Sequence, residues 1–392
     1  MKSSVIVAGA RTPIGSFLGS LSSLKAVELS AIAIQGAIEK AGVKKEQVQQ
    51  VIMGQVLQGG VGQAPARQAS LGAGLSVSVP CTTVNKVCGS GLKAVMMAAD
   101  EIALGRSSVI VAGGMESMSN APYIIPQARQ GLRMGDYKAV DLMIHDGLLD
   151  PYSKAHMGTF GDACAKKYGF SREQQDVYAM ESYRKAQHAQ SQGYFSHEIV
   201  KAKIMLKGEA HYVGNDEEPQ RFLPNKMSSL KPAFHADGSV TAANASKIND
   251  GACALVIMDE HEARAQKLAP CARILGYHTF AHEPAWFTTA PVMAIRTLLK
   301  ELSLKVSDID LLEINEAFSV VAMTAIKELE LDASCVNVFG GAVALGHPIG
   351  CSGARILLTL SNALNVHKKR LGCAAVCLGG GEAVAMVIER LE

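Results

Sequence analysis

The sequence predicts an α/β protein made of two similar halves packed as layers of helices and strands, with a less regular segment inserted into the chain. Two observations predict this fold. Near each end of the chain, a turn rich in Gly, Ser and Cys is followed by an apolar helix, a short apolar strand and consecutive glycines. Between about residues 120 and 247, Pro, Tyr, His and charged residues become frequent instead. A repeated order of elements is typical of a duplicated unit whose copies bury a shared core.

The size and composition exclude several classes of protein. The chain has 392 residues, of which 48% are hydrophobic and 19% charged, so it is neither disordered nor a small disulfide-stapled protein. Its formal net charge is +2, which provides no overall field for nucleic acid or anionic lipid. Its longest apolar runs are far shorter than the ~20 residues that a membrane-spanning helix needs. We therefore expect no nucleic acid and no membrane as a partner.

The cysteines indicate a reducing compartment. There are nine, and they are scattered along the chain, whereas a secreted protein of this length would usually pair them. The N-terminal region lacks acidic residues before Glu28 and weakly resembles an organellar targeting peptide. Residues 4–8, however, have the apolar character of a buried strand, which could not be removed with a leader. We therefore expect a cytoplasmic protein.

The first copy of the repeated unit begins with the turn at residues 88–92. The apolar residues that follow this turn recur at the spacing of one helix face. Gly105 is placed as the C-terminal cap of the helix. Residues 108–112 are predicted to form an apolar strand that ends at Gly113 and Gly114.

The second copy begins with the turn at residues 350–354. Ser352 is placed as the N-cap of a helix whose apolar residues again share one face. Residues 373–378 are predicted to form the strand, and the glycines at 379–381 follow it. Because the order of elements is the same in both copies, we expect two similar halves that pack against each other.

The segment between the copies is predicted to be an insertion over the core. Ser171 and Gln174 form the pattern of a capping box, which begins a helix that runs to about Gln192. Residues 215–219 and 223–232 have the composition of loops. Insertions of this kind often carry substrate contacts, although a surface excursion without a role would have a similar composition.

These observations divide the chain into three parts. Residues 1–119 and 248–268 are assigned to the N-terminal α/β half, and residues 269–392 to the C-terminal α/β half. Residues 120–247 are assigned to the inserted loop domain. We expect the inserted domain to help bind the substrate.

Two side chains in Gly-rich turns are candidates for catalysis. Cys88 precedes a predicted helix, where unpaired N–H groups and the helix dipole favour the thiolate, which is the nucleophilic form of cysteine. His347 lies between Gly346 and Pro348, in a stiff turn that could hold its imidazole as a general base. From the local sequence alone, Cys88 could equally be an inert buried cysteine, and His347 a histidine with structural hydrogen bonds.

Two further candidates follow short apolar strands. Cys377 lies at the end of a predicted strand, before a Gly-rich turn whose free N–H groups could bind an oxyanion. The alternative for Cys377 is simple core packing. Asn315 follows the apolar residues 309–314 and could orient a water or an oxyanion, although Asn is also frequent in turns.

A structural zinc site is the rival interpretation of some of these residues. Its four ligands would be His347, Cys351, Cys373 and Cys377. Structural zinc usually takes closely spaced cysteines in loops, whereas here one cysteine adjoins a helix and another lies within a strand. We therefore expect no metal.

Together these segments resemble the signature blocks of the thiolase family. The blocks occur in the family's order and extend from residue 5 to residue 385. The block that contains the histidine is highly specific by itself. The matching segments are Val87-Cys88-Gly89-Ser90-Gly91, Asn315-Glu316-Ala317-Phe318, Gly346-His347-Pro348-Ile349-Gly350 within residues 340–355, Cys377-Leu378-Gly379-Gly380-Gly381, and the opening Ala10-Arg11-Thr12-Pro13-Ile14-Gly15.

The resemblance implies a fold, an activity and an assembly. The thiolase fold has two similar halves of βαβαβαββ type, packed as α/β layers, with a loop domain inserted in the first, and such enzymes are usually homotetramers. His156-Met157-Gly158 resembles the short-chain type, which acts on acetoacetyl-CoA. The implied activity is that of an acetyl-CoA C-acetyltransferase. It is the reversible Claisen condensation of two acetyl-CoA molecules to acetoacetyl-CoA and CoA.

The resemblance also implies roles for the candidate residues. Cys88 would accept the acyl group, and His347 would activate Cys88 and help to hold a thioester oxygen, with Asn315 assisting through a water. Cys377 would remove the α-proton of the second acetyl-CoA. The backbone N–H groups of Cys88 and Gly379 would form a second oxyanion hole. A thiolate can store the acetyl group, and two oxyanion sites suit an enolate and a tetrahedral intermediate.

Substrate contacts are implied in the same way. The CoA-binding positions are Leu148, His156, Arg221 and Ser246, which all lie in the predicted insertion. The positions that would shape a small acyl pocket are Met157, Phe234 and Phe318. The chemistry requires no cofactor, because the CoA thioesters are themselves substrates.

Three other functions were weighed. A ketoacyl synthase that uses an acyl carrier protein usually has His or Asn where Cys377 stands. A thiolase for longer 3-ketoacyl-CoAs would share all the catalytic residues. A non-catalytic acyl-CoA-binding protein would not need the complete set of Cys88, His347 and Cys377.

Overall fold

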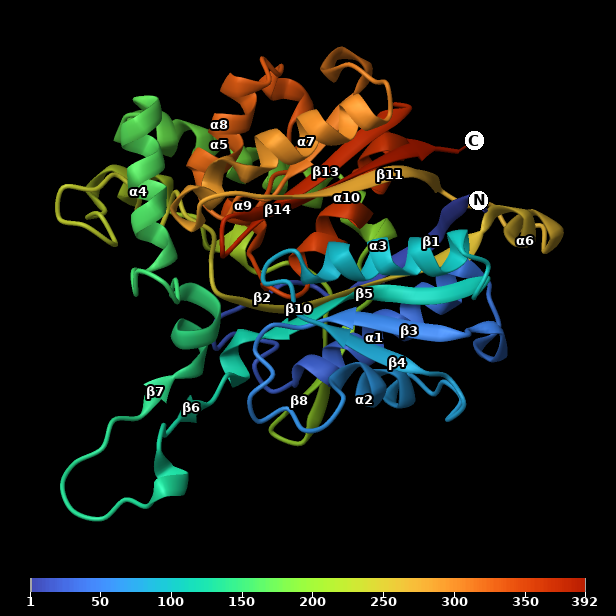
Figure 1. Cartoon of the computed structure of the whole chain (residues 1–392), viewed down its shortest axis with the longest axis horizontal. Coiled ribbons are helices and arrows are strands. Elements are labelled where there is room, and N and C mark those ends of the chain that lie inside the picture. The colour runs from blue at the N-terminus through green and yellow to red at the C-terminus, as the bar shows by residue number, and fades with distance from the viewer. Residues whose placement is uncertain (1, 392) are drawn as a thin grey trace.

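The computed structural model describes residues 2–391 and shows a mixed α/β protein (Figure 1). Its strands form a ten-stranded sheet in the order β12-β13-β14-β11-β1-β10-β5-β3-β4, with β2 (Gly15–Ser16) paired to β10 off this path. In the middle of this order, β1 pairs with β11 only at Val5–Arg273 and Ile6–Ala272. The sheet therefore divides there into an N-terminal and a C-terminal half, and the predicted fold class is confirmed.

The two halves have the same strand order and the same strand directions. In the N-terminal half, β3 is parallel to β5, β5 is antiparallel to β10, and β10 is antiparallel to β1. In the C-terminal half, β12, β13, β14 and β11 repeat these relations in the same order. The strands concerned are β1 (Ser4–Arg11), β3 (Gln50–Gly54), β4 (Cys81–Val84), β5 (Val109–Ser117), β10 (Asn249–Asp259), β11 (Ala272–Ala281), β12 (Leu311–Ile314), β13 (Leu371–Leu378) and β14 (Glu382–Arg390).

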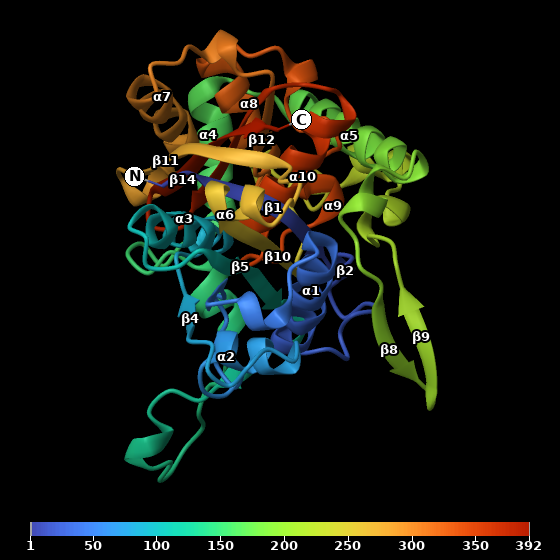
Figure 2. The ribbon, with the colours of Figure 1, turned by 90° about the vertical axis from the view of Figure 1, so that its right-hand side faces the viewer.

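Helices cover both faces of each half (Figures 1 and 2). One outer core joins α1 and α2 to the N-terminal strands, and another joins α7 and α8 to the C-terminal strands. Between the halves, α3 and α10 pack against each other in a central core. Along β1, Ile6 enters the central core, whereas Val5 and Val7 enter the outer one, so both faces are buried. These helices are α1 (Ala26–Ala41), α2 (Pro65–Gly72), α3 (Ser90–Ala103), α7 (Ala290–Glu301), α8 (Ser319–Glu328) and α10 (Ser352–Val366).

The contact between α3 and α10 depends on two equivalent glycines. A Cβ atom on Gly91 would lie 2.8 Å from the backbone nitrogen of Ala354, and one on Gly353 would lie 2.6 Å from that of Leu92. Gly91 and Gly353 occupy the same place in the two copies of the repeated sequence. Backbones approach this closely only where no side chain intervenes. The turns that begin α3 and α10 therefore lie side by side, and their contacts are reciprocal, as expected for two halves related by an approximate two-fold axis.

The predicted end of the first repeated strand was wrong. Strand β5 does not end at Gly113 and Gly114 but continues to Ser117. A Cβ on Gly113 would lie 2.0 Å from the carbonyl oxygen of Cys253, and one on Gly114 would lie 2.0 Å from that of Gly350. These glycines make room for a neighbouring strand and for the loop before α10, so they serve packing rather than a turn.

The inserted segment has its own small elements. The loop between β6 (Tyr123–Ile124) and β7 (Val140–Asp141) extends away from the body of the molecule (Figure 1). The hairpin of β8 (Ala202–Leu206) and β9 (Glu209–Val213) extends in a similar way (Figure 2). Between them lie a short π-helix and two longer helices, which span Met143–Leu148, α4 (Met157–Tyr168) and α5 (Arg172–Ser191). The boundaries that we assigned to this domain stay a prediction.

The predicted helix caps had different outcomes. Gly105 was predicted as the C-cap of α3, but Leu104 takes that position and Gly105 follows it with a φ of 71°. Ser171 is the N-cap of α5, and its capping box with Gln174 is confirmed. Ser352 is not an N-cap, because Cys351 takes that position and Ser352 is the first residue of α10. The Ser352 hydroxyl instead contacts the ring of His347, at 2.6 Å from Nδ1. A partner in the preceding loop, five residues away, therefore replaced the helix N–H group that the sequence pattern favoured.

The remaining elements are short. Both stretches predicted to be loops contain one turn of 3₁₀ helix, at Glu218–Arg221 and at Pro224–Ser229. Within residues 2–391, no helix combines the length and the apolar character needed to cross a lipid bilayer. The other short helices are α6 (Glu260–Ala265), α9 (Ala342–Leu345) and 3₁₀ turns at Lys45–Gln47, Met118–Asn120, Ala128–Gln130, Tyr194–His197, Pro284–Thr289, Val306–Asp308 and Ala333–Cys335.

Candidate active site

Cys88 lies two residues before α3, at the end of a strained turn. The preceding residue, Val87, has a φ of 46°, a left-handed conformation that is costly for a β-branched side chain. Ser90 holds this turn, because its hydroxyl donates to the carbonyl oxygen of Val87 at 2.6 Å and accepts from the N–H of Lys86 at 2.8 Å. Such strain, held in place by its surroundings, is common where a nucleophile must be presented to a substrate.

The sulfur of Cys88 does not rest as the thiolate that its position before a helix suggested. Burial raises the pKa of Cys88 to about 12, although the backbone N–H groups of Cys88 and Gly379 act in the opposite direction. The charge of Glu116 contributes to the rise. At neutral pH the group is therefore a thiol, and a nearby base must remove its proton during the reaction.

His347 has the properties of such a base. Burial, and secondarily the charge of Arg355, lower the pKa of His347 to about 3, so its ring is neutral at physiological pH. The single hydroxyl proton of Ser352 has an acceptor in the carbonyl oxygen of Pro348, at 2.9 Å. The contact of Ser352 Oγ with Nδ1 is then satisfied when Nδ1 carries the proton. This tautomer leaves a lone pair on Nε2, which is buried and has no partner within residues 2–391.

The ring of His347 is also fixed through its backbone. The N–H of His347 donates to Oδ1 of Asn249 at 2.9 Å, and Asn249 in turn donates to the carbonyl oxygen of Gly15 at 2.9 Å. Gly346 has a φ of 107°, and a Cβ there would lie 2.5 Å from the amide of Asn249. A glycine is required at Gly346 for both reasons. The loop that carries the base therefore has little freedom to move.

Cys377 is the last residue but one of β13 and is fully buried. Burial, and after it the neighbouring Cys88, hold the pKa of Cys377 well above its usual value. The N–H of Ala317 faces its sulfur. The structure thus brings the two cysteines together from distant parts of the sequence, and a thiolate formed at Cys377 would be a strong base.

Asn315 and Gly379 complete this group. Among the described residues, neither polar atom of the buried Asn315 side chain has a partner, and neither does Nε2 of His347. Buried polar groups are almost always hydrogen-bonded, so these atoms are suited to a water or a substrate oxygen. The space around Gly379 is open, because a Cβ there would meet only Val87 and Met157, at 3.6 and 3.7 Å.

The predicted acyl-pocket residues form one aromatic cluster beside this group. The rings of His156 and Phe234 stack with centroids 4.6 Å apart, and Phe234 meets Phe318 edge to face at 6.1 Å. Gly158 allows this arrangement, because a Cβ there would overlap the ring of Phe234. Met157 packs against the same core. Nδ1 of His156 accepts the N–H of Gly158 at 3.1 Å, which makes His156 the N-cap of α4.

The other three residues predicted to contact CoA lie in different environments. Leu148 packs in the same small apolar cluster as Cys88 and Ile349. Ser246 is half-buried, and its N–H donates to the carbonyl oxygen of Ala317 at 3.0 Å. Arg221 is exposed at the end of a 3₁₀ turn, and among the described residues no hydrogen bond or ion pair is recorded for its side chain. Its role stays a prediction.

Two buried residues of this region were missed in the sequence. Glu116 lies near the end of β5, and its carboxylate accepts the N–H groups of Val56, Leu57 and Gly350 at 3.0, 3.2 and 3.0 Å. Burial raises the pKa of Glu116 to about 7. Asn249 begins β10 and holds His347, as described above. Neither residue lies in a pattern that indicates a site, because their partners are distant in sequence.

The region contains no arrangement that suits a metal ion. Within residues 2–391, no group of three or more His, Cys, Asp or Glu side chains is placed to hold one. All nine cysteines lie within the described residues and are free, including the three that were considered as zinc ligands together with His347.

Comparisons with known proteins agree with this geometry. The N-terminal domain model of the thiolase family matches residues 4–261, and the C-terminal domain model matches residues 268–390. The chain belongs to the thiolase family. It is 49% identical to a cytosolic acetyl-CoA acetyltransferase of Gibberella zeae, over 99% of this chain and 98% of that protein. It is 52% identical to the mitochondrial acetyl-CoA acetyltransferase of Bos taurus, over 99% and 91% respectively.

Solved thiolase structures have the same fold over the whole chain. The Acat5 thiolase of Ascaris suum, solved in complex with coenzyme A, superimposes with a TM-score of 0.95 at 44% identity, covering 100% of both chains. The acetyl-CoA acetyltransferase of Bacillus anthracis superimposes with a TM-score of 0.97 at 41% identity, covering 100% of this chain and 99% of that one. This thiolase is therefore an acyltransferase with an intact family fold.

Proposed function

We propose that this thiolase is an acetyl-CoA C-acetyltransferase, which condenses two acetyl-CoA molecules to acetoacetyl-CoA and CoA and also catalyses the reverse cleavage. The observation that carries the proposal is the approach of the half-buried thiol of Cys88 to the buried thiol of Cys377, with Nε2 of His347, which has no partner among the described residues, nearby in the fold. Relatives that are named acetyl-CoA acetyltransferases support the same reaction, because they share about 50% sequence identity with this chain over almost its whole length.

In the first half-reaction, Cys88 becomes acetylated. Nε2 of His347 takes the proton of Cys88 as the sulfur attacks the thioester carbon of acetyl-CoA. A water held by Asn315, together with His347, would stabilise the negative oxygen. The C–S bond to CoA then breaks, and the thiol of Cys377 protonates the departing CoA thiolate. This leaves acetyl-Cys88, a protonated His347 and a thiolate at Cys377.

In the second half-reaction, the carbon–carbon bond forms. The Cys377 thiolate removes the α-proton of a second acetyl-CoA, and its raised pKa makes it a strong base for this step. The enolate attacks the carbonyl carbon of acetyl-Cys88, whose oxygen would lie between the N–H groups of Cys88 and Gly379. The Cys88 sulfur leaves and regains its proton from His347. The balanced products are acetoacetyl-CoA and CoA, and no step requires a metal or a redox cofactor.

For substrate binding, we propose that Leu148, His156, Arg221 and Ser246 contact CoA. The aromatic cluster of His156, Phe234 and Phe318, with Met157, would limit the acyl chain to a short one. Ketoacyl synthases usually have His or Asn in place of Cys377, so the second cysteine favours the thiolase reaction. A broader 3-ketoacyl-CoA thiolase is the remaining alternative for the same catalytic residues.

The chain-length preference tests this assignment. We expect the rate of thiolysis to be highest for acetoacetyl-CoA, which has four carbons, and to fall steeply for 3-ketoacyl-CoAs of six and eight carbons, because the proposed aromatic cluster would limit the length of the acyl chain. The measurement is kcat/KM for each substrate at saturating CoA. Equal values across the series would instead assign the enzyme to the broader class.

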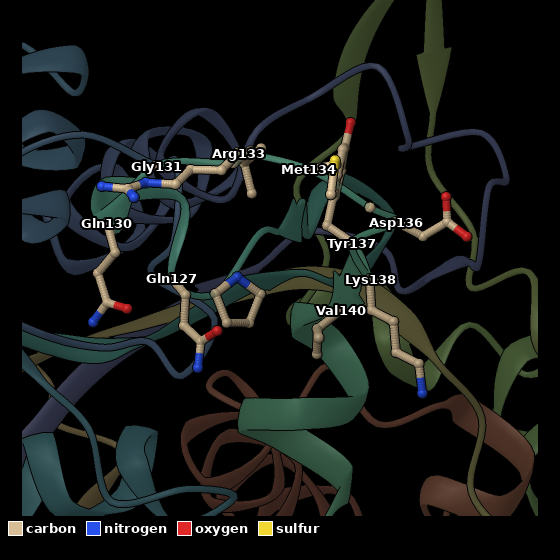
Figure 3. A pocket seen from close by; sticks show the side chains of 12 residues that line it. Gln127, Gln130, Gly131, Arg133, Met134, Asp136, Tyr137, Lys138 and Val140 are labelled. Atoms are coloured by element: carbon tan, nitrogen blue, oxygen red, sulfur yellow. The ribbon is translucent and has the colours of Figure 1, made fainter.

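We propose that the assembly is a homotetramer. The loop between β6 and β7 carries exposed apolar side chains, which include Leu132, Met134 and Tyr137. Figure 3 shows Met134 and Tyr137 on this loop. Apolar side chains on a protruding loop are typical of a contact between subunits. We expect the particle mass in solution to be four times that of the chain. Replacing Leu132, Met134 and Tyr137 together by serine should lower it, and a wild-type monomer would contradict the proposal.

For the compartment, we propose the cytoplasm. The nine free cysteines support a reducing environment. Relatives occur both as cytosolic and as mitochondrial proteins. The use of acetyl-CoA places the proposed reaction in lipid metabolism.

A further inference from the structure

We propose that Glu316 is a positioning residue of this active site, a role that rests on the proposed function. Its carboxylate would fix the turn that carries Asn315 and Ala317 relative to the loop that carries His347. It would also tie both segments to helix α5 of the inserted domain. Glu316 is fully buried and touches neither reacting sulfur in the contacts that the structure records.

The carboxylate of Glu316 has four hydrogen-bond donors from three parts of the chain. Oε1 accepts from the hydroxyl of Tyr178 and from Nδ2 of Asn337, both at 2.8 Å. Oε2 accepts from the hydroxyl of Ser182 at 2.8 Å and from the N–H of Val343 at 3.0 Å. Tyr178 and Ser182 belong to α5, whereas Val343 belongs to α9, four residues before His347. One side chain therefore joins the inserted domain to the loop of the base.

The approach of the carboxylate to this loop is built into the backbone. A Cβ atom on Gly341 would lie 2.2 Å from Cδ of Glu316, so only glycine admits the carboxylate there. The N–H of Gly341 donates to the same Ser182 hydroxyl at 3.0 Å. On the other side of Val343, Nζ of Lys247 lies 3.3 Å from the Val343 carbonyl oxygen. Val343 is thus held at its N–H and at its carbonyl.

The turn that contains Glu316 is also held in place on the side that faces Cys377. The N–H of the next residue, Ala317, faces the sulfur of Cys377, and its carbonyl oxygen accepts the N–H of Ser246 at 3.0 Å. The preceding residue, Asn315, carries two unpartnered polar atoms. A shift of this turn would therefore displace Asn315 and Ala317 together. Misplacement of catalytic groups by about 1 Å can cost roughly 10²-fold in rate.

Replacing Glu316 by glutamine tests this role. Two of the four donors, on Asn337 and Val343, are N–H groups that cannot become acceptors for the new amide. The hydroxyls of Tyr178 and Ser182 can rotate to accept from an amide. Asn337, however, is locked by its hydrogen bonds with both backbone groups of Ile314, at 2.8 and 2.9 Å, and Val343 presents a backbone N–H. In either orientation, the glutamine NH₂ group would face one of these two donors. The local geometry must then change while the side-chain size does not.

The control is a buried glutamate away from the site. Glu198 is also fully buried, and its carboxylate accepts from Arg11, Thr359 and Asn362 at 2.7, 3.1 and 2.8 Å. Glu198→Gln disturbs a buried ion pair in the core and should lower stability at least as much as Glu316→Gln. It should leave the rate constant of Cys88 acetylation within about twofold of wild type when measured well below its melting temperature.

The experiment measures the pre-steady-state rate of Cys88 acetylation against acetyl-CoA concentration for the full-length enzyme. For Glu316→Gln, we expect the limiting rate to fall roughly 10- to 100-fold while the half-saturating concentration stays within about threefold. If Glu316→Gln does not fold, Ser182→Ala is used, because it removes one donor to Glu316 and the acceptor of Gly341; we expect a smaller fall of the same kind. A wild-type limiting rate in the variant tested, or losses that follow melting temperature in both glutamate variants, would overturn the proposal. If wild type itself is not acetylated, the proposed function fails instead.

Discussion

Replacing Cys377 by alanine is expected to separate the two half-reactions of this enzyme. Acetyl transfer from acetyl-CoA to Cys88 should become slower, because Cys377 no longer protonates the departing CoA, but it should still occur, because the nucleophile and the base at His347 remain. Acetoacetyl-CoA synthesis should fall by roughly 10²- to 10⁴-fold, which is the contribution expected of a general base. The measurements are the intact mass of the protein after incubation with acetyl-CoA, and the rate of product formation. The acetylated form should therefore accumulate.

A matched control for this prediction lies on the same strand. Cys373 is fully buried in β13, on the same strand face as Cys377 and in the same core. Cys373→Ala removes an equivalent sulfur without reaching the proposed site, so it should retain synthesis within a few-fold of wild type. An equal loss in both variants would show that alanine acts through packing of the strand and would contradict the assignment of Cys377 as the base.

Replacing Cys88 by serine should abolish the acetylated enzyme. A hydroxyl is far less acidic than a thiol, so the neutral ring of His347 activates it much less effectively. We expect both acetylation and thiolysis to fall by at least roughly 10⁴-fold, as when a nucleophile is removed. The readout is the added mass of one acetyl group, located by peptide mapping.

Cys81→Ser is the control for this substitution. Cys81 is half-buried, like Cys88, and begins the edge strand β4. We expect this variant to become acetylated at Cys88 at the wild-type rate. Acetylation of the Cys88→Ser protein to the same extent as wild type would place the covalent intermediate on another residue and refute the proposed mechanism.

Much of the fold could be predicted from the sequence because the relevant signals are local. The helix after Cys88, the capping box of Ser171 and the apolar strand that leads to Cys377 each depend on residues within one element. The repeated order of turn, helix, strand and glycines predicted the duplication, which the structure shows as two half-sheets with identical strand relations. The motifs around Cys88, His347 and Cys377 were specific enough to indicate the family.

The errors arose where a contact with a group outside the element decided the local structure. Gly113 and Gly114 looked like the end of a strand, but Cys253 and Gly350 approach them from distant segments. Ser352 had the type and position of an N-cap, yet its hydroxyl contacts His347 instead. In both cases the local pattern was compatible with two structures, and tertiary packing selected the one that the sequence did not indicate.

The sequence alone determined which residue types are available for catalysis and in which elements they lie. Only the tertiary structure decided their protonation states and the hydrogen bonds that hold them in place. Burial keeps Cys88 as a thiol and His347 as a neutral ring, against the thiolate that a helix N-terminus would favour by itself. The contacts of Glu116, Asn249 and Glu316 could not be predicted, even though Glu316 lies in a quoted motif, because they are hydrogen bonds to groups remote in the chain. Desolvation and long-range hydrogen bonding depend on the assembled fold, so no local pattern records them.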